Sequence, residues 1–432
     1  MSLRPKALLI ITLTVLVGIA GTWSDHSIAA GLWELPLGLL LLGLAYEGWF
    51  AARTRLCLAI ESRDVAALGQ AVPLELRLRH DRGRELMVEI APDTPEGVDT
   101  NEDVQVVRVA PEHGTALRRE VVPRRLGSHA WPAQRGRLAG PLGLAWWWRR
   151  LDVEFELRVT PRLLGAQATL ARGAHSGLRE RPRVGAGSEL LQLREYQPGD
   201  PQSLIDWKAS ARTGRLISRE HTADQHLDIL IAIDAGRASS LRAGELDRLG
   251  HYANLAAQFA EYAVGCDDRV GLMIFADRPL AALPPARGAS AVLRIRQLLG
   301  AARSVPAEAD PLRAALLVRS LARQRCLVVM LTDLEDATLA GQLAQAARLL
   351  LPKHLPLLAG LKSPEAEAMT EAEAHTWLDP YEALAAREYL ARLQRNVQAL
   401  RALGAPALVA RPDRLRRAVF EAYVDFRRRR RV

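Results

Sequence analysis

Residues 227–234 read LDILIAID, and residues 326–333 read CLVVMLTD. Each stretch is short and apolar and ends in an aspartate. Strands buried on both faces of a parallel sheet have this composition, because helices cover both faces. The two stretches therefore predict inner strands of an α/β domain, with Asp234 and Asp333 at their carboxyl ends.

Helix and strand patterns alternate around these two stretches. Over residues 246–263 small and apolar residues recur at steps of three and four, and Gly265 provides a stop. This alternation predicts a doubly wound sheet over residues 226–432. Further strands are expected at 269–277, from 279, at 354–361 and at 407–412, and further helices at 291–302, 312–323, 337–350, 383–403 and the end of the chain.

Residues 56–161 have a different pattern. Runs such as VPLELRLRH (72–80) alternate apolar and polar residues and are separated by Gly, Pro and Asp. Alternation with turns at this spacing predicts an all-β sandwich-like domain. Within it, GPLGLAWWWRR (140–150) carries three tryptophans. We expect these in the core or at a membrane, with an exposed binding patch as the alternative.

Two uncharged or nearly uncharged apolar runs, residues 7–23 and 32–50, lie near the N-terminus. Each is about long enough to cross a hydrocarbon core of roughly 30 Å. Trp23, Trp33 and Trp49 stand where interfacial aromatics are expected. A cleaved signal peptide is the alternative for the first run, but the second run argues against it.

Charge asymmetry orients this hairpin. Lys and Arg flank its outer ends, whereas the connecting segment carries Asp25 and Glu34. We therefore expect residues 1–55 to cross a bacterial inner membrane twice, with both termini and the soluble domains in the cytoplasm. The three cysteines fit a reducing compartment, since they are widely spaced and form no CxxC pair.

The formal net charge of +9 does not by itself indicate nucleic acid. The arginines are spread along the chain, with one dense cluster at 427–431 that is expected to be a solvated tail or a contact to anionic lipid. No motif that reads RNA or DNA accompanies them, so no specific nucleic-acid partner is expected.

Asp234 and Asp333 are candidate ligands of a hard divalent cation, because carboxyl ends of parallel strands meet at one edge of the sheet. The alternative is that each aspartate caps the helix that follows it. The spacing alone leaves both interpretations open.

Residues 162–225 are predicted to connect the two domains, and their second half is dense in opposite charges and aromatics. Three interpretations remain open for this half: an ion-pair network, a partner-binding surface, and a clamp between the domains. The candidate partner-binding residues are Arg194, Glu195, Tyr196, Asp200, Asp206, Trp207 and Arg212.

No hydrolytic signature is present, since GxSxG, HExxH and GxxxxGK[ST] are all missing. No nucleophile is paired with a base in the sequence. We therefore expect a binding protein and not an enzyme.

REYQPGD (194–200) and IDWKASAR (205–212), followed by Arg219-Glu220, closely resemble the signature of the bacterial domain-of-unknown-function 58 family. Gly140 to Leu144 also has a counterpart there. The resemblance implies a membrane hairpin, a β-rich region, and a von Willebrand factor A-like, Rossmann-like domain. It further implies a partnership with a MoxR-type AAA+ ATPase or a client protein, in chaperone-like, envelope or stress-related systems.

The metal motif of such domains reads DxSxS, whereas this chain has Asp234, Gly236 and Ala238 at its three key positions. Ser290 corresponds loosely to a later hydroxyl ligand, and Asp333 matches the remaining acidic position. We expect either no cofactor or weakly held Mg²⁺ or Mn²⁺. The leading hypothesis is a membrane-anchored protein-interaction module. The alternative is a structural factor of an envelope complex in which the A-like domain only packs.

Overall fold

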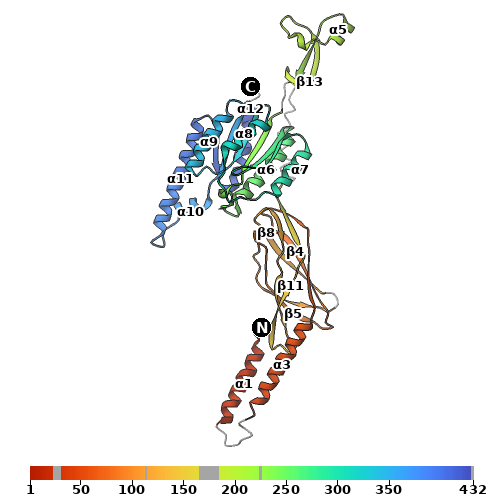
Figure 1. The fold of residues 1–432 in the computed structure, drawn as a ribbon, viewed down its shortest axis with the longest axis vertical. Helices are drawn as coiled ribbons and strands as arrows, with labels where there is room; N and C mark the ends of the chain where they lie inside the picture. The colour runs from red at the N-terminus through yellow and green to blue at the C-terminus, as the bar shows by residue number, and fades with distance from the viewer. Residues whose placement is uncertain (23–30, 112–113, 165–183, 223–225, 430–432) are drawn as a thin grey trace. The chain divides into compact units, whose positions relative to one another are not determined.

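The computed structural model describes residues 1–22, 31–111, 114–164, 184–222 and 226–429 (Figure 1). It is a mixed α/β protein with several sheets. The chain divides into two compact units, Met1–Pro161 and Arg162–Val432. Parts of the predictions lie outside the described residues, namely Trp23, Asp25, Arg430, Arg431 and residues 165–183 of the connector.

Two helices begin the first unit, α1 (Pro5–Thr22) and α3 (Glu34–Arg53). Helix α3 is long and apolar enough to cross a membrane. The apolar part of α1 is shorter, so α3 alone meets this criterion among the residues described. Ala7, Leu40 and Leu144 form a small buried cluster that joins the two helices to the loop before β11.

The rest of the first unit is β-structure, and the alternation predicted for runs such as VPLELRLRH (72–80) is confirmed. In β4 (Val72–His80), Leu74, Leu76 and Leu78 are buried, whereas the residues between them are partly exposed. Three sheets result, with orders β1-β11-β10-β5-β7, β2-β4-β8-β6 and β3-β12-β9. Their other strands are β1 (Ser2–Leu3), β2 (Leu56–Glu61), β3 (Val65–Ala67), β5 (Leu86–Ile90), β6 (Val98–Asp99), β7 (Gln105–Val109), β8 (Thr115–Pro123), β9 (Gly127–Ala130), β10 (Gln134–Ala139), β11 (Ala145–Leu151) and β12 (Glu156–Thr160).

The second unit contains a six-stranded sheet of order β19-β18-β15-β20-β21-β22. All neighbouring pairs are parallel except β18 and β19. Residues 227–234 and 326–333 lie side by side, so their prediction as inner strands is confirmed. The strands are β15 (Asp228–Asp234), β18 (Arg269–Phe275), β19 (Pro279–Ala286), β20 (Cys326–Leu331), β21 (Leu355–Leu361) and β22 (Ala407–Ala410).

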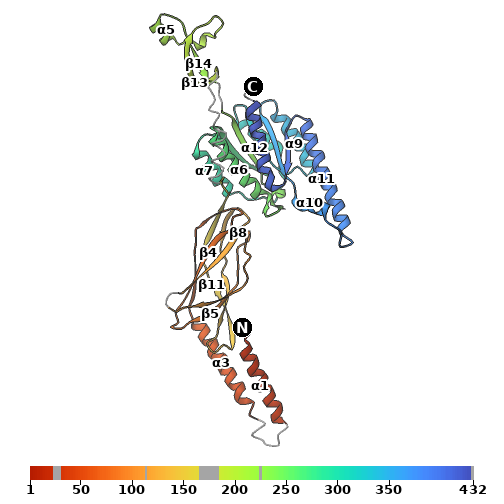
Figure 2. The same cartoon turned by 180° about the vertical axis from the view of Figure 1, so that it is seen from behind.

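Helices cover both faces of this sheet (Figures 1 and 2). Leu230 and Ala232 of β15 face a core shared with α8, α9 and α11. Helices α6 and α12 pack together through Phe259 and Tyr423, whose ring centroids are 5.3 Å apart. The helices are α6 (Arg248–Gly265), α7 (Ala289–Gly300), α8 (Pro311–Leu321), α9 (Ala337–Leu350), α10 (Pro364–Glu371), α11 (Asp379–Ala402) and α12 (Pro412–Arg429).

The C-terminal arginine cluster is not a purely solvated tail, so that expectation needs correction. Arg427 belongs to α12 and donates to Asp268 at 3.3 Å and to the Cys266 carbonyl at 3.0 Å. Asp268 is 1% exposed and also accepts a hydrogen bond from Tyr423. One arginine of the cluster therefore links α12 to the turn between α6 and β18.

The described part of the predicted connector contains an antiparallel hairpin. Strand β13 (Val184–Glu195) pairs with β14 (Ile217–Thr222), and the short helix α5 (Trp207–Thr213) lies between them in sequence. We call residues 192–222 the arm. Its hairpin and helix carry the labels β13 and α5 in Figures 1 and 2.

Candidate functional site

Arg194 is the centre of the charge network in the arm. Its Nη2 lies 2.8 Å from Asp200 Oδ1, and its Nε donates to Glu220. Its Nη1 donates to the Glu195 carbonyl at 3.0 Å. The Arg194 guanidinium therefore links β13, the turn after it and β14. Of these partners, Glu220 was not among the residues predicted for the site.

The carboxyl groups around Arg194 are held in their charged form. The Arg194 guanidinium and the Gln197 backbone N–H lower the pKa of Asp200. Hydrogen bonds from Gln192 and then Arg194 lower the pKa of Glu220. Both groups are therefore ionised at neutral pH, and both are paired with Arg194 inside the arm.

Asp206 is the N-cap residue of helix α5. Asp206 Oδ1 accepts from the Lys208 and Ala209 N–H groups, both at 3.0 Å, which is a standard N-cap. Its Oδ2 lies 3.4 Å from Arg219 Nε. Trp207, directly after the cap, is left 65% exposed.

The arm brings together the predicted partner-binding residues in two groups. Arg194, Glu195, Tyr196 and Asp200 share one network, in which the Tyr196 hydroxyl donates to the Asp200 carbonyl at 3.3 Å. The second group belongs to α5: Asp206 caps this helix, and Trp207 and the exposed Arg212 lie within it. Each hydrogen bond and ion pair given for these residues joins two residues of the arm.

At the sheet edge, Asp234 is 1% exposed and its oxygens are occupied by protein donors. Its Oδ2 accepts from the Thr332 hydroxyl at 2.7 Å, and its Oδ1 accepts from the Gly236 N–H at 2.7 Å. Burial raises the pKa of Asp234. A Cβ atom at Gly236 would lie 2.9 Å from the Ala307 carbonyl oxygen, so this close approach explains why no serine stands there.

Asp333 forms an ion pair with a buried arginine. Arg248, 5% exposed, places its Nη1 2.9 Å from Asp333 and its Nη2 2.6 Å from Glu335. The Tyr389 hydroxyl donates to the same Glu335 oxygen. Burial raises the pKa of Asp333 to about 6, although Arg248 opposes this shift.

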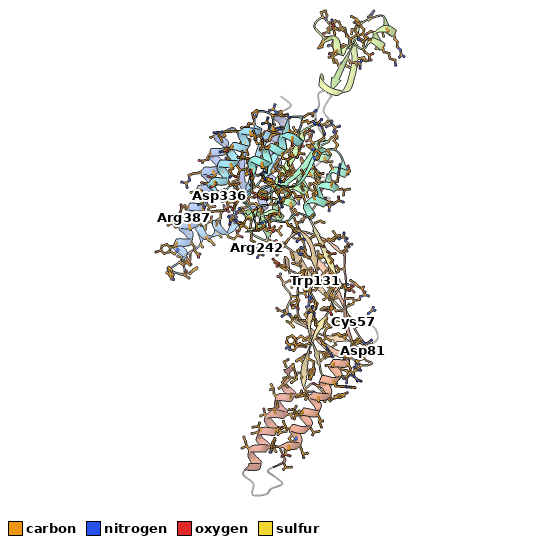
Figure 3. The ribbon with its side chains drawn as sticks, in the orientation of Figure 1. Cys57, Asp81, Trp131, Arg242, Asp336 and Arg387 are labelled. Carbon is orange, nitrogen blue, oxygen red and sulfur yellow. The ribbon has the colours of Figure 1, made fainter. Side chains whose placement is uncertain are left out.

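The helix-cap alternative for the two aspartates is wrong. Asp336, labelled in Figure 3, caps α9 by accepting from the Thr338 and Leu339 N–H groups. Asp333 instead accepts from the Glu335 N–H at 2.8 Å, and Asp234 bonds Gly236 in the turn that follows β15. Both aspartates therefore accept backbone N–H groups of the turns that follow β15 and β20.

The residues at this edge do not fit a divalent cation. Arg248 already supplies the positive charge beside Asp333, and a metal ion there would be repelled by it. The hydroxyls at Asp234 come from Thr332 and Ser239, whereas Ser290 lies exposed in the first turn of α7. Among the described residues, no three His, Cys, Asp or Glu side chains are grouped to hold a metal.

Sequence reasoning missed Arg248, Glu335, Thr332 and Ser239. Thr332 precedes Asp333 in the chain, so its position beside a candidate ligand was a usable signal. Arg248 carried no such signal, because only the packing of α6 brings it to the end of β20.

Residues 192–373 match the family described as Protein of unknown function DUF58. The matched part begins in the arm and includes Asp234, Arg248 and Asp333. No curated protein sequence matches the chain.

Two solved structures have a partial likeness to the chain. The conserved hypothetical protein BatB from Bacteroides thetaiotaomicron is 20% identical over 32% of this chain and 68% of its own, with a TM-score of 0.28. The CARDB domain of PF1109 from Pyrococcus furiosus is 14% identical over 24% of this chain and 94% of its own, with a TM-score of 0.17.

Proposed function

We propose that this protein is a membrane-anchored interaction module that works with a MoxR-type AAA+ ATPase or with a client of such an ATPase. In this proposal the six-stranded sheet and its helices form a von Willebrand factor A-like domain, and the arm is the recognition surface. The observation that carries it is the state of the arm: Asp200 and Glu220 are paired with Arg194 inside it, while Trp207 is 65% exposed.

An exposed tryptophan on an ordered helix is suited to recognition. Trp and Arg are the side chains most often found at interface hot spots, because they bury a large area and still form polar contacts. Arg212 and Lys208 lie exposed on the same short helix as Trp207. The partner surface should therefore offer an apolar pocket with acidic groups at its rim.

The membrane anchor in this proposal consists of α1 and α3. Helix α3 supplies one span by length and composition, and α1 would supply the second despite its shorter apolar part. In this proposal Lys and Arg at the outer ends of the two helices orient both termini and the rest of the chain toward the cytoplasm of a bacterial inner membrane.

The sheet edge supports a binding role that uses neither metal nor catalysis. Arg248 fills the place beside Asp333 where a cation would sit, and the Asp234 oxygens are bonded to Thr332 and Gly236. We therefore propose that partners are recognised through protein contacts, and that the domain has no enzymatic activity of its own.

The test uses the full chain in lipid nanodiscs and purified candidate AAA+ ATPases, with affinity measured by biolayer interferometry. The Trp207→Ala and Arg212→Gln double variant should bind at least about 10-fold more weakly, as hot-spot truncations do. Trp377→Ala is the matched control, since Trp377 is 80% exposed on the sheet domain. Equal binding by wild type and the arm variant would exclude the arm as the recognition surface.

A second candidate, a structural factor of an envelope complex, is favoured by the buried contact between α3 and the β region at Glu47. Such a contact suits a rigid scaffold. Under this alternative, cells that express only residues 1–161 would keep the function, whereas the interaction-module proposal requires its loss.

A further inference from the structure

Two arginines share one phenylalanine ring where α3 ends. The Arg84 guanidinium carbon lies 4.2 Å from the centroid of the Phe50 ring, and that of Arg82 lies 4.7 Å from it. Both arginines come from the turn between β4 and β5. Two like charges beside one ring repel each other, so an anion would stabilise this arrangement.

Protein acceptors satisfy only part of the hydrogen-bonding capacity and charge of the cluster formed by Arg82 and Arg84. Arg82 Nε donates to the Thr54 hydroxyl at 3.1 Å, but its buried Nη2 has no hydrogen-bond partner among the described residues. Asp81 lies 3.7 Å from Arg82 and also accepts the Arg55 backbone N–H. Arg84 is exposed, and the nearest acidic residue in sequence, Glu85, is exposed as well.

The cluster lies at the boundary between apolar and polar surface. Exposed leucines cover α3, among them Leu39 at 71% and Leu42 at 70%. Toward the end of the helix Trp49 is 52% exposed, and the Arg53 guanidinium lies 4.9 Å from its ring. Asp81 is labelled where α3 meets the β region in Figure 3. Trp, Tyr and Arg side chains gather in this way at the headgroup level of a bilayer.

We propose that Arg82 and Arg84 form a binding site for the phosphate of an anionic phospholipid, with the exposed Trp49 against the upper acyl chains and the buried Phe50 ring beneath the two guanidiniums. This inference rests on the membrane anchoring proposed above. The lipid is favoured over free phosphate because α3, whose Phe50 lies under the two guanidiniums, exposes Trp49 and several leucines that a soluble anion would leave in contact with water. The site holds the start of the β region at the membrane surface.

The experiment compares the full chain in nanodiscs of phosphatidylcholine alone and of phosphatidylcholine with phosphatidylglycerol. Native mass spectrometry counts the phosphatidylglycerol molecules that remain bound after release from mixed nanodiscs. The wild type should retain phosphatidylglycerol with an enrichment that Arg82→Gln plus Arg84→Gln lowers about 10- to 30-fold, as expected for two cations near a bilayer surface. Arg108→Gln plus Arg118→Gln, two exposed arginines of β7 and β8, should keep the enrichment.

The outcomes separate this inference from the anchor itself. If the wild type fails to enter nanodiscs of either composition, the anchoring proposal is wrong. If it enters both but shows equal enrichment with and without the two arginines, the lipid site is wrong. Displacement of phosphatidylglycerol by millimolar inorganic phosphate would also overturn the site. Arg84→Gln alone, at an exposed position, repeats the test should the double variant fail to fold.

Discussion

The carboxyl group of Glu47 in α3 accepts the backbone N–H of Leu144 at 3.0 Å. The same side chain accepts the Leu142 and Ala145 N–H groups, both at 2.9 Å, and is fully buried. Gly140 makes this approach possible, because a Cβ atom there would overlap the carboxyl group. The GPLGL loop is thus wrapped around one side chain of the apolar helix.

Glu47→Ala should destabilise the first unit by about 3 kcal/mol or more, because it leaves three N–H groups, two of them buried, without an acceptor. Thermal unfolding of the full chain in detergent, followed by tryptophan fluorescence, measures this loss. Glu34→Ala is the control, since Glu34 is exposed at the start of the same helix. A similar midpoint for both variants would contradict the role given to Glu47.

Removal of Arg248 should both destabilise the sheet domain and open it to metal. Arg248→Ala leaves the buried Asp333 and the half-buried Glu335 without a cation, at a cost of about 3–5 kcal/mol. In calorimetric titrations the wild type should bind no Mg²⁺ or Mn²⁺ below millimolar concentrations, whereas the variant should gain measurable binding. Arg294→Ala, on the exposed side of α7, is the control. Tight metal binding by the wild type would refute the assignment.

Asp333 should make stability depend on pH. Because its folded pKa of about 6 exceeds the ordinary aspartate value of about 3.9, the folded state holds the proton more tightly. Its contribution is therefore full below about pH 4 and is lost as pH rises through about 6. Compared with Asp333→Asn, the wild type should lose about 2–3 kcal/mol of unfolding free energy over this range. Parallel stability curves from chemical denaturation would contradict this assignment.

The sheet could be predicted from the sequence because its inner strands are apolar on both faces, as the fully buried β15 and β20 show. Strands β10 and β11 could not, since QRGRLA and AWWWRRL break the alternation with glycine and arginine. Their register is set by pairing across the sheet, for example Arg137 with Glu89. Such cross-strand partners are far apart in the chain.

The candidate site, like the fold, was predictable from the sequence only in part. Arg194 and Asp200 are six residues apart, so their network was predictable from a local cluster. Arg248 reaches Asp333 across a long sequence separation, and only the folded domain reveals that an arginine occupies the position considered for a metal. Charge balance at a sheet edge is a tertiary property that strand patterns do not contain.

His354 should give a pH dependence of the opposite sign. Its ring is fully buried, and neither ring nitrogen has a hydrogen-bond partner in the described part of the chain. Burial, followed by the nearby Lys353 and Arg319, lowers the pKa of His354. Stability should therefore be present above about pH 6.5 and decline below it, since the unfolded chain binds the proton more readily. His354→Leu should flatten the decline between pH 7 and 5 in chemical denaturation, and His375→Leu, at an exposed position, should leave it unchanged.

Arg194 and Trp207 should have separable roles in the arm. Arg194→Ala removes the guanidinium shared by Asp200 and Glu220, so amide hydrogens of β13 and β14 should exchange faster in hydrogen–deuterium exchange. Trp207→Ala removes only an exposed side chain and should leave this exchange pattern unchanged while weakening partner binding. Arg194→Lys should restore little of the protection, because an ammonium group cannot bridge both carboxylates in the geometry of a guanidinium. If Trp207→Ala instead accelerates exchange throughout the arm, Trp207 stabilises the hairpin and the recognition role must lie elsewhere.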